Sequence, residues 1–159
     1  IADNPNLDLN GNDVLDECEC IFTSYCSSNP NSTGVPGTIS FFGNAFCGAN
    51  QFNLSADDLP TNQFGVFFYG PNAIEIPFGE GYRCVGGAIT RLAVINTGPF
   101  GDAGAFVDNT IAPNLGQIEK GSTWNFQFWY RDPSAGDVDG DGVEENFNLT
   151  NALQVTFCE

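Results

Sequence analysis

Two acidic stretches of this chain carry oxygen-bearing side chains at alternate positions. The first runs from Asp8 to Asp16 and the second from Asp137 to Glu145. A loop with this spacing turns positions 1, 3, 5 and 9 toward its centre, and position 7 offers its backbone carbonyl. Because calcium is a hard cation that takes six to eight oxygen ligands, the sequence predicts one Ca²⁺ ion in each loop.

The second loop gives the stronger match to this pattern. Its predicted ligands are Asp137, Asp139, Asp141, the carbonyl of Val143 and Glu145, with Gly142 at the sixth position. Position 12 holds Asn148 instead of the usual bidentate Glu, so we expect Asp132 or Glu144 to complete the site. The five acids between residues 137 and 145 repel one another strongly when no cation is bound.

The first loop departs from the pattern at its turn. Its predicted ligands are Asp8, Asn10, Asn12, the carbonyl of Val14, Asp16 and Glu19. Asp13 stands at the sixth position, where glycine is wanted, and the glycine is Gly11 instead. The backbone path must therefore differ from that of an EF-hand loop. For both loops the alternative is a solvated turn, since Asp, Asn and Gly favour turns by themselves.

The six cysteines form an even set in a chain that has no histidine and no C-x-x-C pair. They are Cys18, Cys20, Cys26, Cys47, Cys84 and Cys158. This pattern favours disulfides over zinc and predicts an oxidising, extracellular compartment. Six cysteines allow 15 pairings. We favour Cys26 with Cys158 and Cys47 with Cys84, while Cys18 and Cys20 bond within the N-terminal segment or to a neighbouring chain.

The charge of the chain excludes several classes of partner. Twenty acids stand against four basic residues, for a formal net charge of −16. Nucleic acids and anionic membrane surfaces both require a Lys/Arg footprint that this chain lacks. We expect no membrane insertion, because no apolar run approaches the roughly 18 residues that cross a bilayer. With 15 Phe, 4 Tyr and 2 Trp, the chain has the aromatic content of a folded domain.

The elements that must position these loops are short strands. Residues 1–20 are polar and turn-rich and predict an extended calcium-binding arm, whereas residues 21–159 predict one folded domain. Short alternating apolar runs broken by Gly, Pro, Asn and Asp are typical of antiparallel β-structure. We expect strands near residues 38–46, 51–55, 64–69, 73–78, 89–95, 105–108, 123–130 and 152–157. About eight to ten strands favour an all-β, two-sheet antiparallel sandwich.

The two clearest strands, residues 123–130 and 152–157, predict a hairpin whose connection contains the second acidic loop. Alternation places Trp124, Phe126, Phe128 and Tyr130 on one face, and Leu153, Val155 and Phe157 line the core from the returning strand. Trp129 falls on the opposite face. Tyr69, Tyr82 and Trp129 are candidates for a sugar-stacking surface, with core packing as the alternative.

Other motifs are less specific. Asn31, Asn53 and Asn148 each begin an N-glycosylation sequon. Pairs such as Glu75 with Glu80 resemble the two carboxyl groups of a glycosidase. However, a chain without histidine, with few basic residues and no serine nucleophile motif, lacks most groups for proton transfer and oxyanion stabilisation. We therefore expect no enzymatic activity.

Several stretches are similar to a known but uncharacterised domain type. They are residues 29–34, 68–71, 82–87, 121–133 and 147–158, and the similarity is specific at its C-terminal end. The chain resembles a β-domain of secreted or surface proteins of environmental bacteria, over about 130 residues. In that family the domain often follows Asn/Asp-rich repeats ending in Asp-Glu-Cys-Glu, as at residues 16–19, which resemble dockerin and thrombospondin type 3 calcium loops. The resemblance implies no activity.

These observations together predict a secreted structural protein. An arm without its own core suits addition of a β-strand to a neighbouring copy, and head-to-tail contacts that do not close produce filaments. The leading hypothesis is a self-assembling subunit of an extracellular fibre or surface layer, stabilised by calcium and disulfides. The alternative is a calcium-dependent adhesin or carbohydrate-binding module that recognises surface glycans.

Overall fold

The computed structural model describes residues 20–158, which form an all-β domain without an α-helix. The prediction of antiparallel β-structure is confirmed. The eleven strands are β1 (Ile21–Tyr25), β2 (Thr38–Gly43), β3 (Phe52–Asp57), β4 (Phe64–Gly70), β5 (Asn72–Phe78), β6 (Gly81–Gly86), β7 (Thr90–Asn96), β8 (Ala103–Phe106), β9 (Thr123–Arg131), β10 (Phe147–Leu149) and β11 (Ala152–Thr156). No helix in this range is long and apolar enough to cross a membrane.

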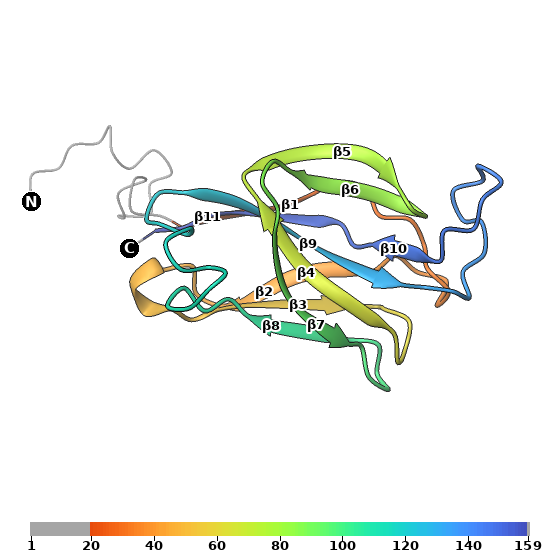
Figure 1. The fold of residues 1–159 in the computed structure, drawn as a ribbon, viewed down its shortest axis with the longest axis horizontal. Helices are drawn as coiled ribbons and strands as arrows, with labels where there is room; N and C mark the ends of the chain where they lie inside the picture. The colour runs from red at the N-terminus through yellow and green to blue at the C-terminus, as the bar shows by residue number, and fades with distance from the viewer. Residues whose placement is uncertain (1–19, 159) are drawn as a thin grey trace, which may run out of the picture.

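The largest sheet has the strand order β1-β11-β9-β4-β7, and β10 extends the pairing of β9 (Figure 1). All of its pairings are antiparallel. The predicted hairpin forms as expected, because Leu153 lies opposite Phe126 and Val155 opposite Trp124. The alternating sequence of β9 thereby directs Phe126, Phe128 and Tyr130 to one side of the sheet.

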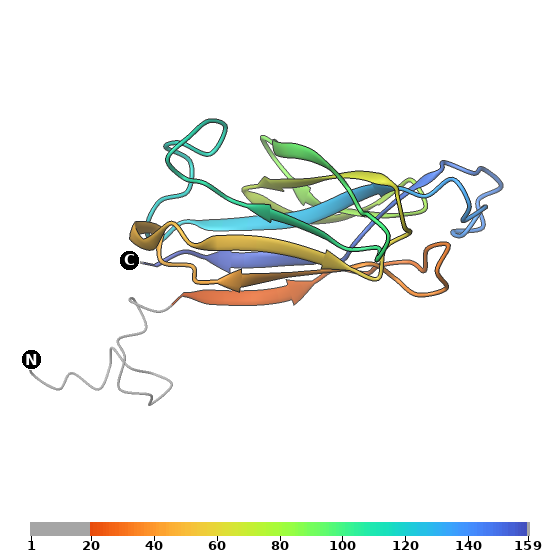
Figure 2. The same ribbon diagram turned by 90° about the horizontal axis from the view of Figure 1, so that it is seen from below.

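The main core lies between this sheet and a smaller one with the order β2-β3-β8 (Figure 2). Aromatic side chains fill much of it. The rings of Phe67 and Phe128 are 4.5 Å apart, and Phe52 contacts both Phe126 and Phe157. All five are buried, so the core has the large apolar area expected from the phenylalanine content.

The β5–β6 hairpin covers part of the outer face of the large sheet and forms a third layer there (Figure 1). Val85 from the hairpin packs with Phe68 and Leu149, and Trp129 packs against this second cluster. Trp129 therefore lies on the face predicted from its phase. Because the hairpin covers it, Gln127 of β9 is fully buried although it faces away from the main core.

Two disulfides hold the described part of the chain together, and both differ from the favoured pairings. Cys20 bonds to Cys158 and Cys26 bonds to Cys84, so Cys26–Cys158 and Cys47–Cys84 were wrong. The reason is an unpredicted strand: β1 begins before Cys26 and pairs with β11, with Ile21 opposite Thr156. This pairing brings Cys20 to Cys158 at one end of β1.

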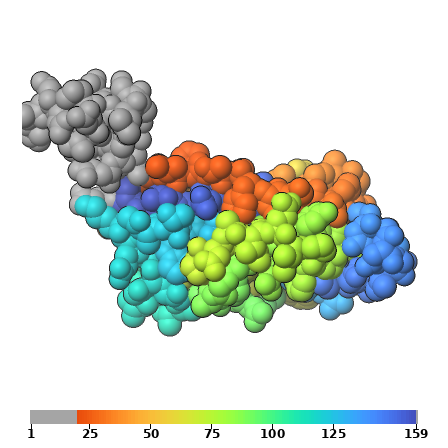
Figure 3. Space-filling model, turned by 90° about the horizontal axis from the view of Figure 1, so that it is seen from above, coloured from red at the N-terminus to blue at the C-terminus, as the bar shows by residue number. Residues whose placement is uncertain are grey.

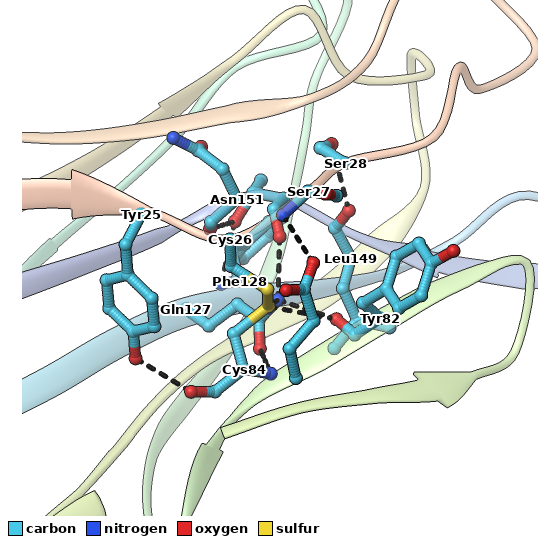
Figure 4. Close-up of a disulfide and its surroundings, with 12 residues drawn as sticks. Tyr25, Cys26, Ser27, Ser28, Tyr82, Cys84, Gln127, Phe128, Leu149 and Asn151 are labelled. Carbon is cyan, nitrogen blue, oxygen red and sulfur yellow. Dashed lines mark hydrogen bonds between the residues drawn. A yellow bond between two sulfur atoms is a disulfide. The ribbon is translucent and has the colours of Figure 1, made fainter. Parts of the chain in front are cut away.

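At the other end of β1, Cys26 meets Cys84 of β6 above a buried hydrogen-bond network (Figure 4). Gln127 accepts a hydrogen bond from the N–H of Cys84 and donates to the carbonyls of Tyr82 and Thr150. Tyr25 also donates to the carbonyl of Cys84. The network satisfies polar groups that the third layer has removed from water.

Candidate metal centre

The second acidic stretch forms the loop between β9 and β10, and aspartate side chains organise its backbone. The two carboxylate oxygens of Asp137 accept hydrogen bonds from the N–H groups of Gly140, at 2.8 Å, and Gly142, at 2.9 Å. The carboxylate at the first position therefore folds the next five residues back around itself. Gly142 has φ of +93°. Glycine adopts this backbone conformation readily because it has no Cβ atom, which explains why it stands at the sixth position.

The next two aspartates repeat this arrangement along the loop. Asp139 accepts a hydrogen bond from the N–H of Asp141, and Asp141 accepts one from the N–H of Val143. Each of these bonds uses one carboxylate oxygen. Asp137, Asp139 and Asp141 each offer a carboxylate oxygen within 4.8 Å of the other two, a spacing at which one cation can contact all three.

A fourth acid, Glu80, reaches the loop from the turn between β5 and β6. Its backbone N–H donates to the carbonyl of Phe147, which fixes the turn against β10. The preceding Gly79 has φ of +57°, and a Cβ atom there would collide with the ring of Phe147. This close approach brings the hairpin turn beside the loop (Figure 3). The side chain of Glu80 is fully buried.

The Glu80 carboxylate binds the backbone of the loop at three points. It accepts hydrogen bonds from the N–H groups of Val138 at 2.7 Å, Asp139 at 3.3 Å and Glu145 at 3.0 Å. Glu80 thus holds the beginning and the end of the loop together. Three N–H donors compensate for the burial of a charged group that would otherwise be strongly unfavourable.

Glu80, Asp139 and Glu145 form a second group whose carboxylate oxygens lie within 4.8 Å of one another. Asp139 belongs to both groups, so the two are continuous. The Oε2 atom of Glu145 is buried and has no hydrogen-bond partner. A buried carboxylate oxygen without a donor fits a bound cation, and all the side chains present supply oxygen, as hard cations prefer. The acidic groups can therefore hold a metal ion.

The ionisation of the two glutamates reflects this crowding. Burial alone would raise the pKa of Glu80, but the N–H groups of Glu145, Val138 and Asp139 outweigh it and hold that pKa below its usual range. The pKa of Glu145 is raised by burial, by its hydrogen bond with Glu80 and by the charges of Asp141 and Glu80. Without a metal ion, Glu145 therefore keeps a proton more readily than Glu80 does.

The residues expected to close the loop lie elsewhere. Asn148 is buried in β10, where its amide donates to the carbonyls of Asn29 and Pro30. Asp132 is buried and accepts a hydrogen bond from the N–H of Ser32. Glu144 is exposed and belongs to neither carboxylate group.

Glu80, which we did not expect near this loop, belongs to the second carboxylate group, whereas Asp132 and Glu144 belong to neither. The sequence offers one signal for Glu80, an acid between Gly79 and Gly81 in a turn. It does not show that this turn contacts Glu145, which lies 65 residues further along the chain. The ligand role of the Val143 carbonyl stays a prediction.

Two of the three glycosylation sequons have buried asparagines. The side-chain amide of Asn31 donates to the carbonyl of Asp58 and to the hydroxyl of Tyr130, and Asn148 is engaged as described above. The burial of both amides counts against a glycan at either position, and both sites stay predictions. Asn53 is half-buried and remains a prediction.

The first acidic loop and Cys18 lie outside the described residues, so the predicted ligands from Asp8 to Glu19 stay predictions. No protein family, curated protein or solved structure was found that matches the chain. The resemblance to a β-domain of bacterial surface proteins therefore remains an expectation, and the functional argument rests on the geometry of this domain.

Proposed function

We propose that the protein is a self-assembling structural subunit of an extracellular fibre or surface layer. The observation that carries this proposal is the exposure of apolar side chains on β1, the strand at one edge of the large sheet. Ile21 and Phe22 of this strand are 54% and 59% exposed. Soluble proteins usually protect such an edge with charge, proline or a covering segment, because its free backbone groups pair with other chains.

The other edges of the domain support the same proposal. In β7, at the opposite edge of the large sheet, Val94 is 69% exposed, and in β2, at the edge of the smaller sheet, Phe42 is 58% exposed. Strands with open edges and exposed apolar side chains accept an additional strand from another molecule. Residues 1–20, which lead directly into β1, are our candidate for the donated segment.

The placement of the acidic loop suits a head-to-tail assembly. The loop between β9 and β10 lies at one end of the long axis, and the chain after β11 runs to the opposite end (Figure 1). Contacts between unlike ends generate an open filament unless the rotation closes a ring. Two disulfides also favour an oxidising environment and durability outside the cell.

We further propose that the metal ion is calcium. The candidate ligands contain no histidine or thiolate. The five carboxylates of the two groups and the predicted Val143 carbonyl can supply six oxygens, a number that calcium takes. In this proposal calcium neutralises the loop, so that one end of the strongly acidic subunit can approach another subunit.

The test is electron microscopy and sedimentation of the native protein with calcium, with a chelator, and after calcium is restored. We expect ordered fibres that loosen on chelation and reform. A Phe22→Lys variant should fail to assemble, because a charge at the edge blocks strand pairing. The matched control is Phe100→Lys, in a turn where Phe100 is 87% exposed. Native protein that stays monomeric in calcium would refute the proposal.

The adhesin alternative receives less support. Its sugar-stacking surface was to include Tyr69, yet Tyr69 is fully buried and donates its hydroxyl to Asn114. Tyr82 and Trp129 are half-buried. We therefore keep self-assembly as the conclusion.

A further inference from the structure

A pocket of about 300 Å³ lies on the outer face of the large sheet, on the side away from the main core. Strands β4, β7 and β9 provide its floor, and the β5–β6 hairpin provides one wall. Five apolar side chains line it, Val66, Phe68, Phe78, Ile89 and Trp129. A pocket of this size with mainly apolar walls is typical of a small-molecule site.

The polar part of the lining consists of Arg83 and Arg91. They are two of only four basic residues in a chain with 20 acids. Among residues 20–158, neither guanidinium group has an ion pair or a hydrogen bond. The Nε atom of Arg83 is buried without a partner, and its guanidinium carbon lies 5.9 Å from the centre of the Phe78 ring.

This arrangement is unusual on electrostatic grounds. A buried donor of a charged group costs free energy when nothing accepts its hydrogen bond. The 20 acids outnumber the four basic residues of the chain five to one, yet no side chain that lines the pocket is an acid. Among the described residues, Arg83 therefore has only the Phe78 ring as a partner, and the exposed Arg91 has no acid beside it in the pocket.

The chemistry of the lining defines what can bind. Arginine stays protonated and only donates hydrogen bonds, so a ligand must bring the acceptors. A carboxylate matches the planar guanidinium and can accept two bonds from it. The rings of Phe68, Phe78 and Trp129 favour a flat apolar body. A neutral sugar fits poorly, because its hydroxyl groups would find no acceptor among these side chains.

We propose that this pocket binds a small aromatic carboxylate, with the ring on the apolar floor and the carboxylate between Arg83 and Arg91. The net charge of the chain repels anions at long range, so affinity must come from contact within the pocket.

The test is isothermal titration calorimetry of the full chain with 2-naphthoate. The neutral isostere 2-naphthamide shows whether binding depends on the negative charge of the carboxylate. We expect saturable binding of one naphthoate per chain and at least about tenfold weaker binding of the amide, since charge-assisted hydrogen bonds are lost. Arg91→Gln and Arg83→Gln should each weaken naphthoate by about tenfold or more. Arg91 is exposed, so its variant should fold normally.

The matched control is Arg131→Gln, which removes the same charge at an exposed position outside the pocket and should bind naphthoate as the native chain does. Equal affinity for naphthoate and naphthamide, or unchanged binding in both pocket variants, would overturn the proposal.

A synthetic peptide of residues 1–19 provides a second titration. If the peptide binds and naphthoate does not, and the pocket variants abolish this binding, the pocket receives the chain's own acidic segment and the small-molecule assignment is wrong.

Discussion

The carboxylate of Glu80 accepts a hydrogen bond of 3.0 Å from the backbone N–H of Glu145, 65 residues further along the chain. This bond joins the β5–β6 turn to the end of the acidic loop. The same carboxylate binds the beginning of the loop through Val138. A cation held by Asp139 and Glu145 would therefore be fixed to the hairpin as well as to its own loop.

Replacing Glu80 should weaken calcium binding more than any single change at the loop surface. In Glu80→Gln the shape is kept, but one negative charge and part of the acceptor capacity are lost. We expect a loss of about 10- to 100-fold in affinity, as is usual when groups that orient metal ligands are removed. Calorimetric titration of calcium into metal-free protein measures it.

The control for this change is Glu144→Gln, which removes the same charge from an exposed residue of the same loop. Its calcium affinity should change by less than about threefold, because screened surface charges contribute little. Equal losses in the two variants would show that net charge, and not the position of Glu80, determines the affinity.

Calcium affinity should fall as the pH falls. Burial, the hydrogen bond with Glu80 and the neighbouring charges raise the pKa of Glu145 above its ordinary value of 4.5 in the metal-free protein. Calcium must displace that proton, so binding weakens as the pH drops toward the raised pKa. The pKa of Glu80 is lowered, so Glu80 stays ionised over this range.

Titrations between about pH 7 and about pH 5 test this relation. In Glu145→Gln the affinity should be lower throughout and should depend less on pH, because the competing proton is absent. A native affinity that is constant over this interval would contradict a proton on Glu145.

The fold could be predicted from the sequence where one face of a strand is apolar. The alternation of Trp124, Phe126 and Phe128 defined β9 and its pairing with β11, because a shift of one residue would reverse both faces. Strand β1 was missed. Its residues Ile21–Tyr25 lie at an edge and are mostly exposed, so no apolar periodicity marks them. The disulfide pairings were wrong for the same reason.

The candidate site was predictable only where its ligands are close in sequence. Asp137, Asp139 and Asp141 come from one loop, and local spacing is sufficient to place them together. Glu80 arrives through the packing of Gly79 against Phe147. A contact of that kind depends on tertiary structure, and a single sequence contains no periodic signal for it.

Calcium should raise the thermal stability of the domain. A ligand that binds only the folded state at about 100 times its Kd contributes about 2.7 kcal/mol, which corresponds to about 5–10 °C in Tm for a chain of this size. Differential scanning fluorimetry measures the shift. Magnesium at the same concentration should produce a smaller one, because it releases its water ligands reluctantly. Equal shifts with both ions would argue against a dehydrated calcium site.

Cys18 and Cys47 should form the third disulfide. Cys47 is the cysteine among residues 20–158 without a disulfide, and its N–H donates to the carbonyl of Cys158. Cys158 is bonded to Cys20, which follows Cys18 by two residues, a span of at most about 7 Å. Non-reducing peptide mapping should recover the Cys18–Cys47 pair.

Thiol counting in denaturant provides the complementary result. Burial and the charge of Glu119 raise the pKa of the Cys47 thiol, so a free thiol would react slowly in the folded protein and must be counted unfolded. We expect no free thiol. A free Cys47, or a Cys18 bonded to the same residue of another chain, would contradict the pairing.

Gln127→Leu should destabilise the domain although it introduces an apolar residue at a fully buried position. The native side chain accepts from the N–H of Cys84 and donates to the carbonyls of Tyr82 and Thr150. Leucine leaves these three backbone groups buried without partners, at a cost of about 3 kcal/mol or more. Urea unfolding with the disulfides intact gives this free energy.

The matched control is Gln154→Leu in the neighbouring strand β11. Gln154 is half-buried and makes one side-chain hydrogen bond, donating at 3.0 Å to the Oδ1 of Asn125. Its replacement leaves one acceptor without a partner instead of three groups and should cost about 1 kcal/mol. A large difference between the two variants would show that the hydrogen bonds of Gln127, beneath the Cys26–Cys84 disulfide, hold the β5–β6 hairpin on the sheet. A Gln127→Leu variant as stable as the native domain would mean instead that the hairpin can move away from the sheet and hydrate its backbone.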